Sequence, residues 1–129
     1  MKRYCIALLL VLLFPCIALG ASVSLTWNPP VFSCDGSTLD DLAGYVILWG
    51  SNSGGPYPNQ HHVDDPAATS TTINVGAVEN MTLYFVSVSV DSSGNRSDGG
   101  GGCGFSNEDS ISFGAVSPSP PSGLSGSAL

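Results

Sequence analysis

The chain has 129 residues, only 10% of which are charged, and its formal net charge is −7 at pH 7. This acidic balance repels phosphate backbones and anionic membrane surfaces, so nucleic-acid binding is not expected. The length suits one domain with a single core, and the regular patterning of the apolar residues argues against an intrinsically disordered body.

The N-terminal segment has the features of a secretory signal peptide. Lys2 and Arg3 precede an apolar stretch from residue 6 to 19, and Ala18-Leu19-Gly20 supplies small residues at a cleavage site. The stretch is shorter than the ~20 residues that a bilayer span needs, and Pro15 interrupts it. We therefore expect residues 1–20 to be removed, no membrane span to be retained, and the protein to be secreted or periplasmic.

Two cysteines, Cys34 and Cys103, remain after the signal is removed. Exported proteins meet an oxidising environment, in which two cysteines commonly pair. Free or intermolecular thiols are the alternative. The mature chain also keeps ten Asp and Glu against the single cation Arg96, so it is more acidic than the full chain.

Six short strands and no helix are predicted after the signal. Apolar and polar residues alternate with the period of two that one buried sheet face produces, and turns rich in Gly, Pro and Asp separate the runs. Such spacing is typical of an all-β sandwich, here in residues 21–114. The Ser-, Pro- and Gly-rich segment 115–129 is predicted to be a flexible tail. In chain order, the predicted strands are residues 22–28, 44–50, 57–63, 69–75, 82–91 and 106–113.

Two of these runs decide which residues reach the core. The run at 82–91 (TLYFVSVSVD) alternates most clearly, and we place it at the centre of a sheet with Phe85 outward. Its inward residues are interpreted as Tyr84, Val86 and Val88. The run at 44–50 is apolar on both faces, so the residues alone leave its orientation open. The alternatives for its inward face are Tyr45, Ile47 and Trp49, or Val46 and Leu48.

Four motifs in order along residues 21–114 resemble those of fibronectin type III domains of exported bacterial proteins. Four ordered motifs are more specific than any one of them. They are residues 25–30 (LTWNPP), similar to the second-strand LxWxPP; 42–47 (LAGYVI), similar to the third-strand LxGYxI; 84–88 (YFVSV) with 91–97 (DSSGNRS), similar to the sixth strand and its turn; and 105–108 (FSNE), similar to the start of the last strand.

The resemblance implies an immunoglobulin-like β-sandwich of six to seven antiparallel strands. It makes Tyr84 the tyrosine-corner residue, packed near Val78 with its hydroxyl bonded to upstream backbone. It also places Tyr45, Ile47 and Trp49 on the inward face of the predicted strand at 44–50, which corresponds to the third strand of the family. The core that it implies consists of Trp27, Tyr45, Ile47, Trp49, Val78, Tyr84, Val86 and Val88.

The chain departs from the family pattern in three places. Asn80-Met81 replaces the usual Pro-Gly before the corner strand, Asp109 occupies a normally apolar position, and two inserted loops each carry a cysteine. Because these two loops emerge at the same end of the family fold, the resemblance implies a disulfide between Cys34 and Cys103. The run Gly99–Gly102 is interpreted as slack that lets Cys103 reach its partner.

No catalytic site or cofactor is expected, because the chain has no Ser, His and acid set and no phosphate-binding loop. His61-His62 beside Asp64-Asp65 suggests a metal site, but adjacent residues of a strand point to opposite faces, so a solvated strand edge is favoured. Asp91 and Asp98 around Gly94 suggest a calcium loop that lacks the spacing of an EF-hand, and the resemblance explains Asp91 as a turn residue. His61, His62, Asp91 and Asp98 are thus only weak candidates for metal ligands.

Two surface features carry the functional hypothesis. Val46, Leu48 and Phe85 are predicted to form a small exposed apolar patch, which is either a contact surface or an ordinary scatter of apolar groups. The first strand begins close to the mature N-terminus, so the sheet edge beside it is open to a strand from another chain. We expect a non-catalytic module that binds a protein or a cell-envelope polymer. The alternatives are self-association into an extracellular fibre by strand exchange, and a carbohydrate-binding accessory role.

Overall fold

Six β-strands and no helix make up the part of the chain that the computed structural model describes, residues 20–115 and 120–128. The strands are β1 (Ala21–Thr26), β2 (Leu42–Gly50), β3 (Asn59–Val63), β4 (Ser70–Gly76), β5 (Thr82–Asp91) and β6 (Asp109–Ser112). The six predicted strands are confirmed, with ends that differ by at most three residues. No helix long and apolar enough to cross a bilayer is found in these residues. Apart from Gly20, the predicted signal peptide lies outside them.

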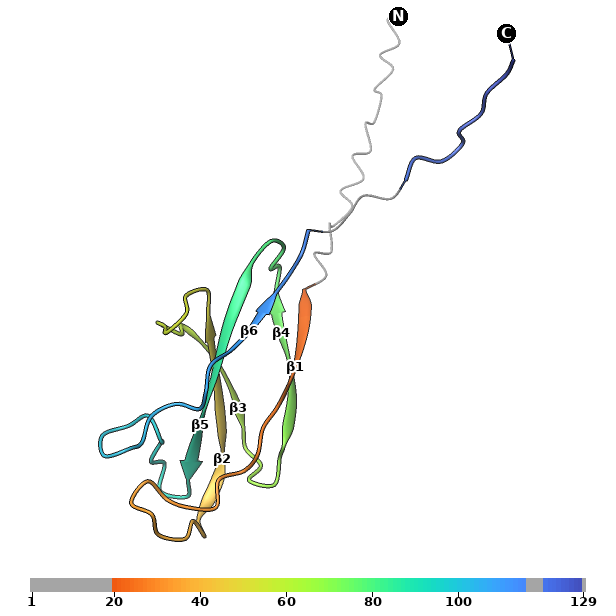
Figure 1. The fold of residues 1–129 in the computed structure, drawn as a ribbon. Helices are drawn as coiled ribbons and strands as arrows, with labels where there is room; N and C mark the ends of the chain where they lie inside the picture. Colours follow the sequence, from red (N-terminus) through yellow and green to blue (C-terminus); the bar gives the residue numbers. More distant parts are fainter. Residues whose placement is uncertain (1–19, 116–119, 129) are drawn as a thin grey trace, which may run out of the picture.

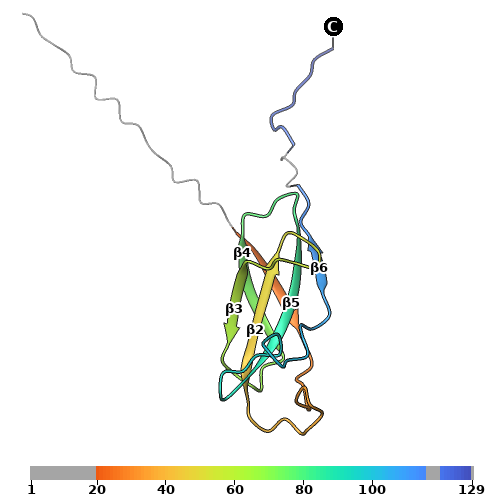
Figure 2. The same cartoon turned by 90° about the vertical axis from the view of Figure 1, so that its left-hand side faces the viewer.

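The strands form two antiparallel sheets that face each other (Figure 1). One sheet pairs β1 with β4, and the other has the order β3-β2-β5-β6, which places β5 centrally, as predicted. The beginning of β1 and the end of β6 lie at one end of the molecule, whereas the loops that follow β1 and β5 lie at the opposite end (Figures 1 and 2).

The main core lies between the two sheets. Side chains alternate along β1 and β4, so Val23 and Ile73 are buried while their neighbours in the sequence are exposed. Tyr45 packs with its ring centre 5.1 Å from that of Trp27. The residues of this core are Val23, Ile47, Ile73, Val78, Leu83 and Phe85, against which Ala21, Leu25, Trp27, Trp49, Val75, Ile111 and Phe113 pack.

The predicted orientation of β5 is wrong by one residue. Phe85 pairs with Trp49, and the two rings stack at 6.1 Å, so both point into the core. Phe85 is only 3% exposed, and Leu83 takes the position near Val78 that the resemblance assigned to Tyr84. The residues that were predicted to point inward instead lie on the outer face of the sheet, which faces away from β1 and β4. They are Tyr84, Val86 and Val88.

The error has a physical reason in the sequence of β5. Both alternating sets of residues on this strand contain apolar side chains, and the set of Tyr84, Val86 and Val88 holds more of them than the set of Leu83 and Phe85. The structure buries the other set against the second sheet, because Leu83 and Phe85 form one cluster with Val23 and Ile73 of β1 and β4. As a result, Ser87 and Ser89 also point inward, opposite Ile47 and Tyr45.

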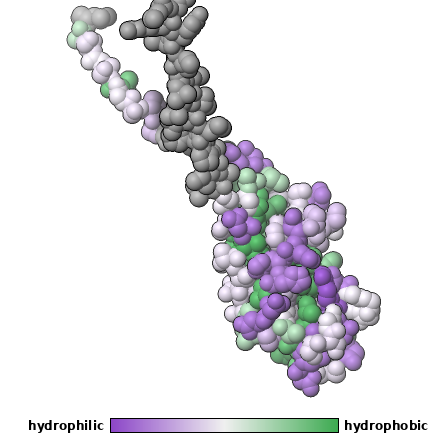
Figure 3. All heavy atoms as spheres, turned by 180° about the vertical axis from the view of Figure 1, so that it is seen from behind, coloured by the Kyte–Doolittle hydropathy of each residue, from purple (hydrophilic) through white to green (hydrophobic). Residues whose placement is uncertain are grey.

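A second apolar cluster covers the outer face of β2 and β5. Val46 is 1% exposed and Leu48 is 9% exposed, so the predicted exposed patch of Val46, Leu48 and Phe85 does not exist. Tyr57, from the loop between β2 and β3, packs on this cluster, and the Phe105 ring meets Tyr57 edge-on at 5.6 Å. On the face seen in Figure 3, hydrophobic residues show only in areas interrupted by hydrophilic ones. The outer cluster consists of Val46, Leu48, Val86 and Val88.

Polar contacts of Glu108 hold the loop that covers the outer cluster. Its carboxylate accepts hydrogen bonds from the Ser53 hydroxyl and from the Gly54 amide, both at 2.7 Å, and from the Tyr57 hydroxyl. These hydrogen bonds, that of Tyr57 foremost, lower the pKa of Glu108, and the same bond raises the pKa of Tyr57. Glu108 therefore joins the segment directly before β6 to the β2–β3 loop.

The turn before β5 forms without the usual Pro-Gly. Asn80 adopts a positive φ of 56°, and the Met81 amide donates to the carbonyl of Val78 at 3.2 Å. Asparagine tolerates this left-handed conformation better than most residues that have a side chain. Asn80 therefore supplies the geometry for which other sequences use glycine.

Candidate functional site

A cleft of about 940 Å³ opens along one long side of the sandwich, between β1 and the strands β5 and β6. Its walls include the end of β1 with the two residues that follow it, from Ser24 to Asn28, and the inward residues Ile47, Phe85 and Ile111 of the larger sheet. The opposite long side is narrower, because His61 on β3 approaches Thr71 on β4 with 3.4 Å between their polar atoms. The two sides of the sandwich are therefore closed to different extents.

The cleft follows the unpaired edge of β1. Within the described residues, β1 pairs only with β4, and the Trp27 amide donates to the Thr69 carbonyl at 2.9 Å. Alternate residues of an antiparallel strand bond to the same neighbour, so the backbone groups of Ser24 and Thr26 point to the other edge, toward the cleft. Leu25 points inward yet is only partly buried. Among the described residues, no strand therefore lies beside this edge of β1, where hydrogen-bonding groups and apolar surface are available.

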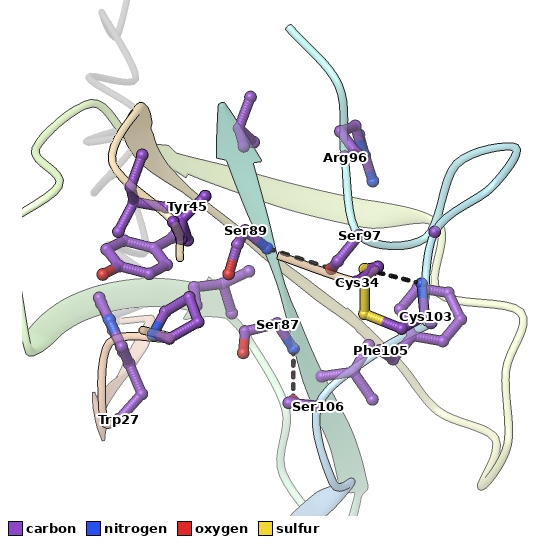
Figure 4. Close-up of a pocket in the computed structure, with 18 of the residues that line it drawn as sticks. Trp27, Cys34, Tyr45, Ser87, Ser89, Arg96, Ser97, Cys103, Phe105 and Ser106 are labelled. Carbon is purple, nitrogen blue, oxygen red and sulfur yellow. Dashed lines mark hydrogen bonds between the residues drawn. A yellow bond between two sulfur atoms is a disulfide. The ribbon is translucent and has the colours of Figure 1, made fainter. Parts of the chain in front are cut away.

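Two serines close the neighbouring edge of β5. The Ser97 hydroxyl accepts from the Ser89 amide at 3.2 Å, and the Ser97 amide donates to the Ser89 carbonyl at 3.0 Å. Ser106 makes the same pair of contacts with Ser87, both at 2.9 Å. Between these anchors the chain leaves the sheet as a loop, residues 98–105. Figure 4 shows both serines along β5, with Trp27 on one side of the strand and Phe105 on the other.

A disulfide between Cys34 and Cys103 ties this loop to the one that follows β1, which confirms the predicted pairing. The two Cα atoms are 5.4 Å apart and the residues are 69 positions apart in the chain. The bond lies at the edge of the cleft beside Phe105 (Figure 4). It fixes the β1–β2 loop against the β5–β6 loop at one end of the molecule.

The glycine run before Cys103 is a compact turn rather than slack. The Gly102 amide donates to the Gly99 carbonyl at 2.9 Å. A Cβ atom at Gly102 would lie 2.1 Å from the carbonyl oxygen of Ser97, so no side chain fits there. The interpretation of the run as a flexible spacer is therefore replaced by one of close backbone packing.

Trp27 and Tyr45 form the aromatic wall of the cleft. The Tyr45 hydroxyl donates to the carbonyl of Pro66 at 3.1 Å, and burial raises the pKa of Tyr45. The indole N–H of Trp27 is buried and makes no hydrogen bond of normal geometry with the described residues, but it lies close enough to the Tyr45 hydroxyl to oppose the rise in the pKa of that group. The Tyr45 hydroxyl is therefore the polar group that this donor faces.

Carboxylates dominate the charge of the cleft. Four aspartates contribute to its lining, and the single cation there, Arg96, is held by Asp98 through two bonds of 2.8 and 2.9 Å. The hydrogen bond from the Ser37 hydroxyl lowers the pKa of Asp35, and that from the Asn95 side chain lowers the pKa of Asp91. The lining therefore has an excess of negative charge at neutral pH. The four aspartates are Asp35, Asp41, Asp91 and Asp109.

Asp109 was singled out from the sequence because it stands at a normally apolar position. It begins β6 and pairs with Phe85, so it belongs to the inward set of residues, yet it is exposed in the cleft. Sequence reasoning did not assign Asp109 or the inward Ser87 and Ser89 to a site. A polar residue at a position expected to point inward is a signal for such a site. For Asp109 the sequence offers this signal, but for the two serines it appears only when β5 is given its correct orientation.

The candidate metal ligands do not come together. His61 points toward Thr71, whereas the adjacent His62 is exposed. The Asp91 carboxylate accepts hydrogen bonds from the backbone of Ser93 and from the backbone and side chain of Asn95, at 2.8 to 2.9 Å, as expected of a turn residue. Within residues 20–115 and 120–128, no three His, Cys, Asp or Glu are placed to hold a metal ion.

Neither a family model nor a curated protein matches this sequence. The cleft, the disulfide and the sandwich-like arrangement of the strands are therefore the basis for inferring a function. A disulfide is compatible with an extracellular location, since oxidising conditions favour its formation.

Proposed function

We propose that the protein is an exported, non-catalytic module of the fibronectin type III type that binds another protein or a cell-envelope polymer. The strand order β3-β2-β5-β6 facing β1-β4 supports this, with β1 as the second strand of the family pattern. The ordered motifs from residue 25 to 108 support it as well, and the signal-like N-terminus and the disulfide support export.

The observation that carries the binding role is the cleft itself. It combines an unpaired strand edge, partly buried aromatic and aliphatic side chains, and loops fixed by a disulfide. Binding sites are commonly concave and apolar, with a few fixed polar groups, and rigid loops lose little entropy when they bind. We therefore place the binding surface in the cleft. The outer face of β2 cannot serve, because Val46 and Leu48 are buried there.

A second candidate is self-assembly into an extracellular fibre. The unpaired edge of β1 favours it, because a strand from another copy would complete the smaller sheet. The two candidates differ in what is found attached to the cleft.

Photocrosslinking in the exporting organism tests both candidates. A photoreactive amino acid is placed at Phe32, a cleft residue that is 63% exposed, and in a matched protein at Met81, which is 39% exposed and does not line the cleft. The proposal expects a discrete covalent adduct with another macromolecule from position 32 only, identified by mass spectrometry. Adducts between copies would support the fibre, and the absence of position-specific adducts would refute the binding role of the cleft.

A further inference from the structure

We propose that the cleft binds an extended, positively charged peptide segment of a partner protein, which adds as a strand to the free edge of β1. This inference rests on the proposed binding function and specifies its site and the chemistry of the ligand. It depends on three independent features: the hydrogen-bonding edge, the shape beside it and the charge around it.

The edge of β1 offers backbone groups that only another backbone matches well. The cleft follows the last three residues of β1, Ser24–Thr26, and continues along Trp27 and Asn28. This stretch is about 16 Å of extended chain and accommodates a strand of about five residues. The outward-directed backbone groups of Ser24 and Thr26 would each supply one donor and one acceptor. Addition of a strand to an open sheet edge is an established mode of peptide recognition.

The other exposed edges are poorer receptors. The edge strand β3, Asn59–Val63, follows Pro56 and Pro58, which discourage pairing, and does not line the large cleft. Strand β6, Asp109–Ser112, is shorter than β3. β4 lies on the side where His61 reaches Thr71, so less room remains beside it. Among the described strands, the edge strands β1 and β6 both border the large cleft, and β1 is the longer of the two.

The interior of the cleft matches alternate small side chains of an added strand. One face of such a strand would cover Leu25 and Trp27, which point inward but are only partly buried. Opposite it lie Phe85 and Ile111 at one end and the inward Ser87 at the other, so the space favours small aliphatic groups.

The charge of the cleft determines the sign of the ligand. Asp35, Asp41, Asp91 and Asp109 contribute to its lining, and Arg96 is occupied by Asp98. Lysine or arginine on the second face of the added strand would be attracted to these carboxylates, and acidic residues would be repelled. A second copy fits less well, because the chain as a whole has a charge of −7 and the described tail, residues 120–128, contains no charged residue.

Synthetic peptides test the proposal on the purified, disulfide-bonded protein. Three probes are compared: an alternating Lys-Val peptide, a Glu-Val peptide of the same length, and a peptide with the sequence of residues 120–128. Binding is measured by calorimetry, and by Trp27 fluorescence in a Trp49→Phe variant whose fold is checked by circular dichroism. The proposal expects the Lys-Val peptide to bind at least about tenfold more tightly than the other two, with an affinity that falls as salt rises. Equal binding of the charged peptides, or tighter binding of the tail peptide, would overturn it.

Two pairs of variants locate the peptide. Ser24→Pro removes a backbone donor directed at the cleft, and we expect it to weaken the Lys-Val peptide about five- to tenfold, whereas Ser24→Ala should not. Asp41→Asn should weaken the same peptide about threefold, while the same change at Asp40, which is exposed but does not line the cleft, should have a smaller effect. Unchanged binding by Ser24→Pro, in a protein that still folds, would place the peptide elsewhere and refute strand addition. If the peptides fail while position 32 still crosslinks a partner, the binding function survives and only strand addition is lost.

Discussion

The two faces of the four-stranded sheet are both buried, but by different means. The inner face packs against a second sheet through Ile47, Leu83 and Phe85. On the outer face, the residues that pack on the cluster are Tyr57 from the β2–β3 loop and Val90 from β5 itself. Val46 and Ile47, neighbours on β2, are therefore almost equally inaccessible on opposite faces. The comparison shows that burial alone does not define the core of a sandwich. A face covered by loops depends on the few contacts that hold those loops in place.

Removal of the disulfide should have the largest effect on stability. The bond closes a loop of 69 positions, and its loss should lower the free energy of unfolding by up to about 4 kcal/mol in the chain-entropy account. Chemical denaturation of the Cys34→Ser, Cys103→Ser double variant measures this loss, with the oxidised protein as reference. A variant as stable as the parent would show that the tied loops are not constrained by the bond.

The inner face should be the more sensitive of the two to truncation. Ile47 is 2% exposed between the sheets, and Ile47→Ala should lower the free energy of unfolding by about 3 kcal/mol, because the cavity cannot collapse between two sheets. Urea denaturation monitored by circular dichroism provides the measurement. Thr72→Ala, at an exposed position on β4, is the control and should change the free energy by less than about 0.5 kcal/mol.

The outer face should respond less for each carbon removed. Val88 belongs to the outer cluster, and Val88→Ala removes two carbons where Ile47→Ala removes three. It should lower the free energy of unfolding by about 1.5 kcal/mol, which is less per carbon than at Ile47, since loops relax over a cavity more readily than a sheet does. The same denaturation experiment compares it with Ile47→Ala. A loss at Val88 larger than that at Ile47 would mean that the loop-covered face is the true stabilising core.

The elements of the fold could be predicted because period-two alternation and turn residues are local signals. The disulfide could be predicted as well, since the family resemblance brings the loops of Cys34 and Cys103 to one end. The orientation of β5 could not, because Leu83 and Phe85 compete with Tyr84, Val86 and Val88 for the inward face and alternation does not rank them. Only the pairing of Phe85 with Trp49 decides between the two sets.

The charged cleft could not be predicted from the sequence for a related reason. Asp35 and Asp41 lie on one loop, while Asp91 and Asp109 lie far along the chain, and only the fold brings them to one cavity. The sequence did indicate that Asp109 was unusual and that the edge of the first strand was open. The sequence did not indicate that Ser87 and Ser89 point inward. Because these side chains are small, they leave space between the sheets that larger residues would fill.

The smallest expected effect on stability concerns Glu108, whose hydrogen bonds hold the β2–β3 loop over the outer cluster. Hydrogen bonds from Tyr57, Ser53 and Gly54 lower the pKa of Glu108 in the folded protein. Its stabilisation is therefore present above the ordinary glutamate pKa of about 4.3 and is lost as the pH falls through the lowered folded value. The Gly54 amide donates directly to this carboxylate, so its NMR chemical shift should titrate with a midpoint below the ordinary value. A midpoint at or above that value would contradict the contact.

Glu108→Gln separates this contact from the general effects of acid. The variant should abolish the titration of the Gly54 amide shift while leaving the inner core intact, because the side chain touches only the cover of the outer face. The pKa of Tyr57, which the bond to Glu108 raises, should fall toward its ordinary value in the same variant, as followed by tyrosinate absorbance. If the Tyr57 pKa does not move, the loop must be held by its apolar packing alone. The stability of the outer face would then not depend on the ionisation of Glu108. Like the inner face, it would be stabilised by apolar packing.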